Sequence, residues 1–180
     1  MQNTVTVSGP ISFSTQYFAT RAVVAHSRVS LLSYGFFVGI PLLTLVAMFA
    51  TGYDVGRPSL LGLSTWVVLL SGPVFMFLFL PLCHALHVWQ MRRRNASVRG
   101  VLTFIVTGEG FECHGGSFDV RIRWDAIHRV VETRRFLLFY VSSAMAHFIP
   151  KAFILSSEEL LTIRKISHEA LGDRAKLRAV

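Results

Sequence analysis

Three side chains that commonly bind metal ions lie close together in the sequence, at Cys83, His84 and His87. On a helix, His84 and His87 would share one face because residues three positions apart are neighbours. A structural zinc site takes four ligands, however, and no fourth candidate lies beside these three. Histidines near the end of a hydrophobic segment can also simply contact water and lipid headgroups. We therefore predict no metal site and no cofactor.

A nucleophile and a base could be supplied by the neighbouring Cys113 and His114. Both lie in a predicted strand, where successive side chains point to opposite faces, so they cannot act as a pair. Glu158 and Glu159 precede an apolar run, and acids at the start of a helix complement its dipole. The sequence therefore predicts that the protein is not an enzyme. An enzyme would require histidines and acids from distant segments to converge in one pocket.

The net charge of +8 comes largely from arginines, many of them beside apolar segments. The candidate binding residues are Arg92, Arg93, Arg94, Arg99, Arg121 and Arg123. Each basic side chain next to anionic lipid gains about 1 kcal/mol, which would make these arginines a surface for lipid or for a protein partner. Alternatively, the first four only set the orientation in a membrane and the other two are solvated. Because the excess lies beside hydrophobic segments, nucleic acid is not an expected partner.

The hydrophobic content of 52% is high for an ordinary globular chain and indicates membrane segments. A spanning helix needs roughly 20 mostly apolar residues, and two uncharged stretches are long enough. We place the spans at residues 31–51 and 60–82, with kinks expected near Pro73 and Pro81 because proline lacks a backbone donor. Arginines flank both outer ends of this pair of helices, so the two termini are predicted to be cytoplasmic.

Gly35 and Gly39 form a GxxxG pattern in the first predicted span, a spacing that lets another helix approach closely. The partner helix can be the second span of the same chain, which we favour, or a second copy of the protein. Neither span contains a charged side chain, and charged groups inside the membrane are the usual mark of transport. A two-helix transporter or channel is therefore not expected.

From residue 101 the sequence changes to short alternating runs separated by glycine-bearing turns, which indicates strands. The runs lie at residues 101–107, 111–114, 117–124, 128–133, 136–141 and 146–154. In the third run the apolar side chains that end with Trp124 alternate with Asp119, Arg121 and Arg123. Because strand side chains alternate between faces, we expect Trp124 to face the core and the two arginines to face solvent.

Helical signals lie at both ends of the chain. Ser156 and Glu159 have the spacing of a capping box, which predicts a helix over residues 157–171 that covers the open side of the sheet. Near the amino terminus, Ser14 could cap a helix that begins at Gln16. This segment could lie along the membrane surface or dock on the C-terminal sheet. The predicted divisions are 1–30, the membrane hairpin 31–91, and the C-terminal domain 92–180.

Several residues of the C-terminal domain match a known family. They are Trp124, Ile127, Glu132, Thr133, Phe136, Ile149, Pro150 and Lys151, followed by a helix. With the two expected spans, this pattern resembles the bacterial YcxB-like membrane proteins. The resemblance implies a small pleckstrin-homology-like β domain on an anchor in the bacterial inner membrane, and it implies no catalytic residues. We expect Trp124, Ile127 and Pro150 to belong to the core of that domain.

The expected fold is thus a membrane α-helical hairpin followed by an α+β domain of about six or seven strands, closed by an amphipathic helix. The expected function is that of a membrane-anchored interaction module that presents its basic domain to a cytoplasmic protein or to inner-leaflet lipid. The alternative is an immunity or stress protein that acts on another membrane protein through its helices. The expected partners are the lipid bilayer, anionic lipid and a protein, and homo-oligomers are compatible with the sequence.

Overall fold

The computed structural model describes residues 4–27, 39–50, 74–95 and 100–177. The chain divides into two compact units, one made of Met1–His26 with Val88–Val180 and the other of Ser27–His87. The first unit is thus assembled from two separate stretches of the sequence. We call this first unit the β domain.

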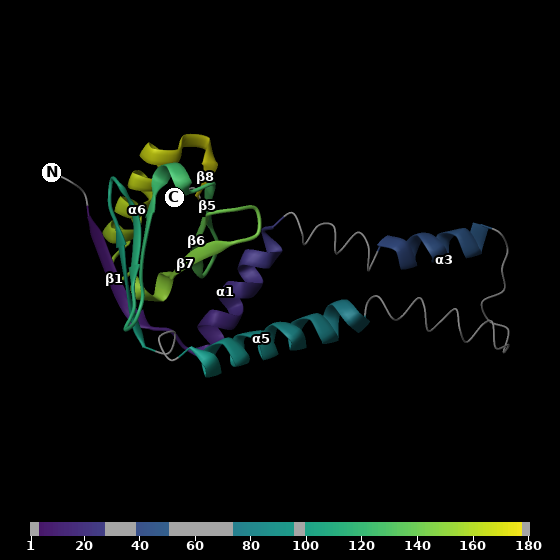
Figure 1. The fold of residues 1–180 in the computed structure, drawn as a ribbon. Coiled ribbons are helices and arrows are strands. Elements are labelled where there is room, and N and C mark those ends of the chain that lie inside the picture. Colours follow the sequence, from purple (N-terminus) through teal and green to yellow (C-terminus); the bar gives the residue numbers. More distant parts are fainter. Residues whose placement is uncertain (1–3, 28–38, 51–73, 96–99, 178–180) are drawn as a thin grey trace. The chain divides into compact units, whose positions relative to one another are not determined.

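The β domain contains two four-stranded sheets (Figure 1). The first is antiparallel in the order β1-β2-β3-β4, with strands Val5–Pro10, Val101–Val106, Gly110–His114 and Asp119–Arg123. The second has the order β7-β6-β5-β8, with β5 at Arg129–Glu132, β6 at Phe136–Tyr140, β7 at Ala146–Pro150 and β8 at Ala175–Lys176. Among the described strands, only the short β8 runs parallel to its neighbour, β5.

The amino-terminal segment joins the sheet of the C-terminal domain through β1. This strand pairs with β2 from Val5 opposite Val106 to Pro10 opposite Val101. Its side chains alternate between buried and exposed, because Val5 and Val7 enter the core while the residues between them face outward. Of the two placements that the sequence left open for this segment, docking on the sheet is the one observed.

Helix α1, Phe13–Ala25, covers the outer face of the second sheet. It is capped by Ser12, whose hydroxyl accepts a hydrogen bond from the Thr15 amide, so the helix begins earlier than the predicted cap at Ser14. Ala19 is fully buried against the sheet. At the other end of the helix, the Tyr140 hydroxyl donates to the Val23 carbonyl at 2.8 Å. Contacts along its length therefore fasten α1 to the second sheet.

Helix α6, Ser157–Leu171, begins with the predicted capping box, in which Ser156 and Glu159 satisfy each other's backbone amides. This prediction is confirmed. Its Ile163 and Ile166 complete the core between the sheets, where the rings of Phe111 and Phe139 stack 4.8 Å apart. Single turns of 3-10 helix, η4 (Trp124–Ala126), η5 (Lys151–Phe153) and η6 (Gly172–Arg174), link the larger elements.

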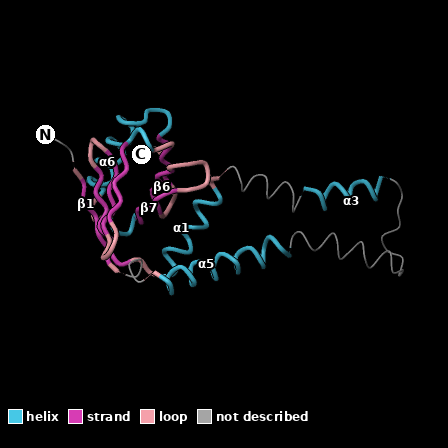
Figure 2. The backbone as a smooth tube through the Cα atoms, in the orientation of Figure 1, coloured by secondary structure: helices cyan, strands magenta, loops and turns pink. Residues whose placement is uncertain are grey.

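The predicted strands at residues 101–154 are present, but the expected fold class is wrong. The described residues form eight strands in two sheets, because β1 and β8 from the two ends of the chain add to the predicted set. The small pleckstrin-homology-like domain of six or seven strands is replaced by this mixed arrangement. Local periodicity could not reveal the two added strands, since their partners lie far away in the sequence. Figure 2 shows β1 in magenta among the other strands of the domain.

The second unit contains helix α3, Ile40–Ala50, the π-helical turn η2, Phe75–Phe79, and the first part of α5, Leu80–Arg94. Among the described residues, no helix is both long enough and apolar enough to cross a membrane. The predicted membrane hairpin and the multi-pass inner-membrane location are therefore wrong for the described chain. Much of the two predicted spans, at 31–38, 51 and 60–73, lies outside the described residues.

The physical reason for this correction is that an uncharged stretch was equated with a continuous apolar helix. Of the first predicted span, the structure describes residues 39–50, most of which form α3. In the second predicted span, a π-helical turn precedes Pro81, whose missing amide interrupts the regular ladder of helical hydrogen bonds. Beyond it, α5 carries Cys83, His84 and His87 and ends in arginines, so it is uncharged at first but not strongly apolar.

Candidate functional site

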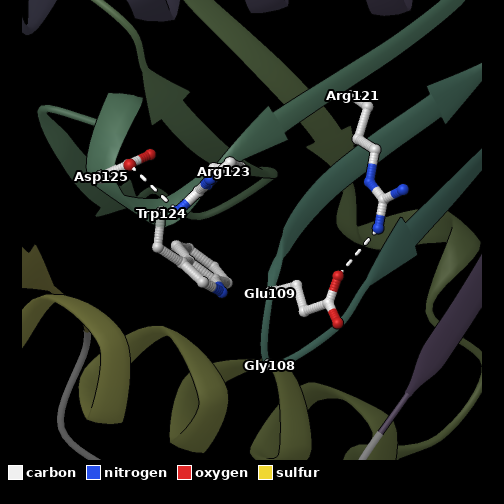
Figure 3. A pocket seen from close by; sticks show the side chains of 6 residues that line it. All are labelled: Gly108, Glu109, Arg121, Arg123, Trp124 and Asp125. Atoms are coloured by element: carbon white, nitrogen blue, oxygen red, sulfur yellow. Dashed lines mark hydrogen bonds and ion pairs between the residues drawn. The ribbon is translucent and has the colours of Figure 1, made fainter.

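A hollow of about 760 Å³ lies where the turn between β2 and β3 meets the end of β4. It is lined by Gly108, Glu109, Arg121, Arg123, Trp124 and Asp125, and we call it the β4 pocket. Figure 3 shows the Arg121 and Glu109 side chains directed toward one another, with Arg123 and Asp125 paired beside the Trp124 ring. Charged groups thus surround one fixed aromatic ring.

Two contacts hold the Trp124 side chain in place. The indole Nε1 donates a hydrogen bond to the Thr107 carbonyl oxygen at 3.0 Å, and the ring lies against Phe139 with centroids 6.3 Å apart. The side chain is buried, as the alternation in β4 predicted. The indole is buried and its single hydrogen-bond donor is bound to the backbone, so the ring forms a rigid wall of the pocket.

The turn beside the pocket depends on Thr107 and Gly110. The Thr107 hydroxyl accepts hydrogen bonds from the amides of Glu109 and Gly110, each at 3.2 Å. A Cβ atom at Gly110 would lie 2.1 Å from the Ile122 carbonyl oxygen, so only glycine permits this approach of β3 to β4. The close approach sets the positions of the pocket's charged side chains.

The two arginines of the pocket are each paired with acidic side chains. Arg121 contacts Glu109 at 2.9 Å and Glu112 at 2.8 Å, and Arg123 contacts Asp125 at 3.4 Å. Both arginines point away from the core, as predicted, with 66% and 79% of their side chains exposed. Two positive and two negative side chains line the pocket, so it is electrically balanced and not a basic patch.

Cys113 and His114 are neighbours on β3 and point to opposite faces, as predicted. Burial, with a smaller contribution from Asp119, raises the pKa of the Cys113 thiol to about 11. His114 contacts Asp119 at 2.8 Å and Glu112 at 3.3 Å, and the hydrogen bond to Asp119 is the main cause that raises its pKa. These two side chains therefore do not form a nucleophile and base pair.

Two of the other predicted binding arginines, Arg92 and Arg93, have local partners. Arg92 donates to the Ile11 carbonyl oxygen at 2.8 Å and to Gln16 Oε1 at 3.3 Å, which ties α5 to the start of α1. The guanidinium of Arg93 lies 5.3 Å from the centroid of the Trp89 ring. Arg94 is exposed at the end of α5, and Arg99 lies outside the described residues.

Of the two helix-packing glycines, Gly35 lies outside the described residues, and no described atom lies within 4 Å of a Cβ added to Gly39. The predicted core residues Trp124, Ile127 and Pro150 are all buried. Within the part of the chain that the structure describes, no three side chains of His, Cys, Asp or Glu gather as a metal site.

Sequence reasoning missed a buried ion cluster that joins three elements. Glu132 in β5 has a fully buried side chain that accepts hydrogen bonds from Arg164 of α6 at 2.7 and 2.9 Å and from Lys151 of η5. Two signals were available, because Glu132 is the acidic residue of an apolar strand and Lys151 belongs to the same family pattern. Its position between a strand and a helix indicates a structural role.

Sequence reasoning also missed an aromatic and cationic surface on α1. Phe13 stacks on Tyr17, Tyr17 meets Phe18 edge to face, Arg21 lies 5.9 Å from the Tyr17 ring, and Arg135 lies 5.0 Å from the Phe18 ring. Phe13 and Phe18 each expose 42% of their surface. We call these five residues the α1 surface. Its signal in the sequence was the run of aromatic residues without any acid before residue 30.

Comparison with known proteins finds a family match over part of the chain. Residues 106–167 match the family model described as YcxB-like protein. This segment is a YcxB-like domain. It includes the β4 pocket and the Glu132 cluster, whereas β1, α1 and β8 lie outside the match. No curated protein and no solved structure matches the chain.

Proposed function

We propose that the YcxB-like domain is part of a non-catalytic interaction module that binds a segment of a protein partner in the β4 pocket. The proposal rests on the lining of this pocket, in which exposed ion pairs surround the fixed Trp124 ring. A polypeptide that carries both acidic and basic side chains complements such a balanced surface better than a purely anionic ligand does.

The charges of the pocket are available for exchange. Exposed ion pairs contribute only about 0–1 kcal/mol each, so a ligand carboxylate can replace Asp125 beside Arg123 at little cost. A ligand ammonium can likewise approach Glu109, which is 64% exposed. The Trp124 wall is fixed by its contacts with Thr107 and Phe139, and preorganisation of this kind reduces the entropy lost on binding.

Site-specific crosslinking tests the proposal in the full chain. A photoreactive amino acid at Asp125, in the pocket, should capture a protein that the same group at Glu169, an exposed position on α6, does not capture. The captured partner should bind the purified chain about tenfold more weakly when Asp125→Lys reverses one charge of the pocket, a change equal to about 1.4 kcal/mol. Equal capture at both positions, or unchanged affinity of the variant, would exclude the pocket as the binding site.

The α1 surface favours a second candidate, binding of anionic lipid. Exposed phenylalanine rings beside arginines are typical of helices that lie at a lipid interface. Vesicles that contain phosphatidylglycerol should retain more of the full chain than phosphatidylcholine vesicles, and Arg21→Glu with Arg135→Glu should remove the difference. If the double variant keeps the preference for phosphatidylglycerol, the α1 surface is not responsible for it.

A further inference from the structure

β4 is the last strand of the first sheet and has only β3 as a neighbour among the described strands. The Gly115 amide donates to the Phe118 carbonyl at 2.8 Å, and the Trp124 amide donates to the Glu109 carbonyl at 3.4 Å. In an antiparallel pair, residues whose backbone groups bond to the partner strand alternate with residues whose backbone groups point away from it. Phe118 and Trp124 bond to the β3 side, so every second residue between them does the same. The backbone groups of β4 that point away from β3 therefore belong to Asp119, Arg121 and Arg123.

No other described residue hydrogen bonds to these outward backbone groups. A free edge of this kind is a ready template for another strand, and proteins usually protect it with charges that repel a second copy. The charges at the two ends of β4 would not repel a second copy, because Asp119 and Arg123 carry opposite signs. Asp119 and Arg123 lie two residues on either side of Arg121, and their side chains are 76% and 79% exposed on the outer face.

We propose that two copies of the chain pair through their β4 edges, antiparallel and about a two-fold axis at Arg121. This register pairs all five residues of the strand and matches its outward backbone groups. It places Asp119 of each copy opposite Arg123 of the other, so two ion pairs form across the axis. On the inner face, Val120 lies opposite Ile122, and both are partly buried residues packed on the core.

The two Arg121 side chains meet at the axis, where like charges would normally repel. Each guanidinium is already held by Glu109 at 2.9 Å and by Glu112 at 2.8 Å. Four carboxylates therefore accompany the two arginines at the axis, and repulsion between the arginines is screened. The resulting dimer would contain one continuous sheet made from the first sheets of both copies. The inference does not depend on the partner proposed for the β4 pocket.

Charge reversal tests the pairing in the full chain, with the dissociation constant of the dimer measured by analytical ultracentrifugation. Arg123→Asp places an acidic side chain opposite Asp119 of the other copy, and Asp119→Arg places a basic side chain opposite Arg123 of the other copy. Either change should weaken association at least about tenfold. The double variant restores opposite charges and should recover wild-type association. Lys165→Asp, a similar reversal of an exposed charge on α6, should have no effect.

Disulfide formation tests the register independently, in a Cys83→Ser background that lacks the exposed native thiol. Residues opposite each other in a hydrogen-bonded antiparallel pair have Cα atoms about 5.5 Å apart, within the range of a disulfide. Two chains that carry Arg121→Cys should form a disulfide with each other. Chains that carry Asp119→Cys should form a disulfide only with chains that carry Arg123→Cys. A monomeric wild-type chain, a dimer insensitive to both reversals, or links in a different register would overturn the proposal.

Discussion

Removal of the buried Glu132 carboxylate should strongly destabilise the β domain. The Glu132 side chain is 0% exposed and holds Arg164 through two hydrogen bonds and Lys151 through a third. Glu132→Gln keeps the size of the side chain but removes its charge. Two cations, each less than 20% exposed, would then share a site without a counter-charge.

The expected cost follows from this geometry. Breaking a buried ion pair by removal of one partner typically costs about 3–5 kcal/mol, because the remaining charge is left uncompensated. Domains are stable by only about 5–15 kcal/mol, so a large share of the folding free energy is at stake. For a chain of this size, 1 kcal/mol shifts Tm by about 2–4 °C, which predicts a decrease of roughly 6–20 °C for Glu132→Gln.

Urea denaturation followed by far-ultraviolet circular dichroism measures the free energy of unfolding. The matched control is Glu169→Gln, which removes an exposed carboxylate 4.0 Å from Lys165 and should cost less than about 1 kcal/mol. Replacement of the whole cluster by Leu at Glu132 and Met at Lys151 and Arg164 should recover much of the lost stability, since apolar substitutes for buried ion groups are often neutral. A cost for Glu132→Gln no larger than that of the control would refute the reasoning.

Three further predictions concern the first sheet. Under native conditions at pH 8, a thiol reagent should modify the exposed Cys83 but not the buried Cys113, whose pKa is about 11, and denaturation should expose both. The pKa of His114 measured by NMR should lie above its ordinary value, and Asp119→Asn should lower that pKa. The stability that protonated His114 contributes should be present below pH 6.5 and should be lost as the pH rises through the raised pKa. Gly110→Ala should lower the free energy of unfolding by about 1–3 kcal/mol in the same urea assay, because its Cβ would overlap the β4 backbone.

Local patterns predicted the elements whose signals are local. The alternation before Trp124 gave the faces of β4, and the spacing of Ser156 and Glu159 gave the start of α6, because both signals depend only on nearby residues. The exposure of Arg121 and Arg123 followed from the same alternation. The acidic partners of Arg121 did not, since Glu109 approaches it through the turn after β2 and Glu112 through the pairing of β3 with β4.

Long-range arrangements could not be read from the sequence. The alternating Val5 and Val7 indicated a strand, but nothing in their spacing identified β2 as its partner. Glu132 looked like one polar residue in an apolar run, and its burial becomes favourable through Lys151 of η5 and Arg164 of a distant helix. The predicted membrane hairpin is wrong for the described residues, because none of their helices is both long enough and apolar enough to cross a membrane.

The pairing of β1 with β2 has a consequence for synthesis on the ribosome. Val5 lies opposite Val106, about 100 residues later in the chain. Chains grow at about 5–20 residues per second, so β1 remains without its partner for roughly 5–20 s after it is made. Closing a loop of this length costs only slightly more entropy than closing a shorter one, so the delay is set mainly by translation. The first of the described strands to be synthesised must therefore wait until β2 has emerged from the ribosome before it can enter the sheet.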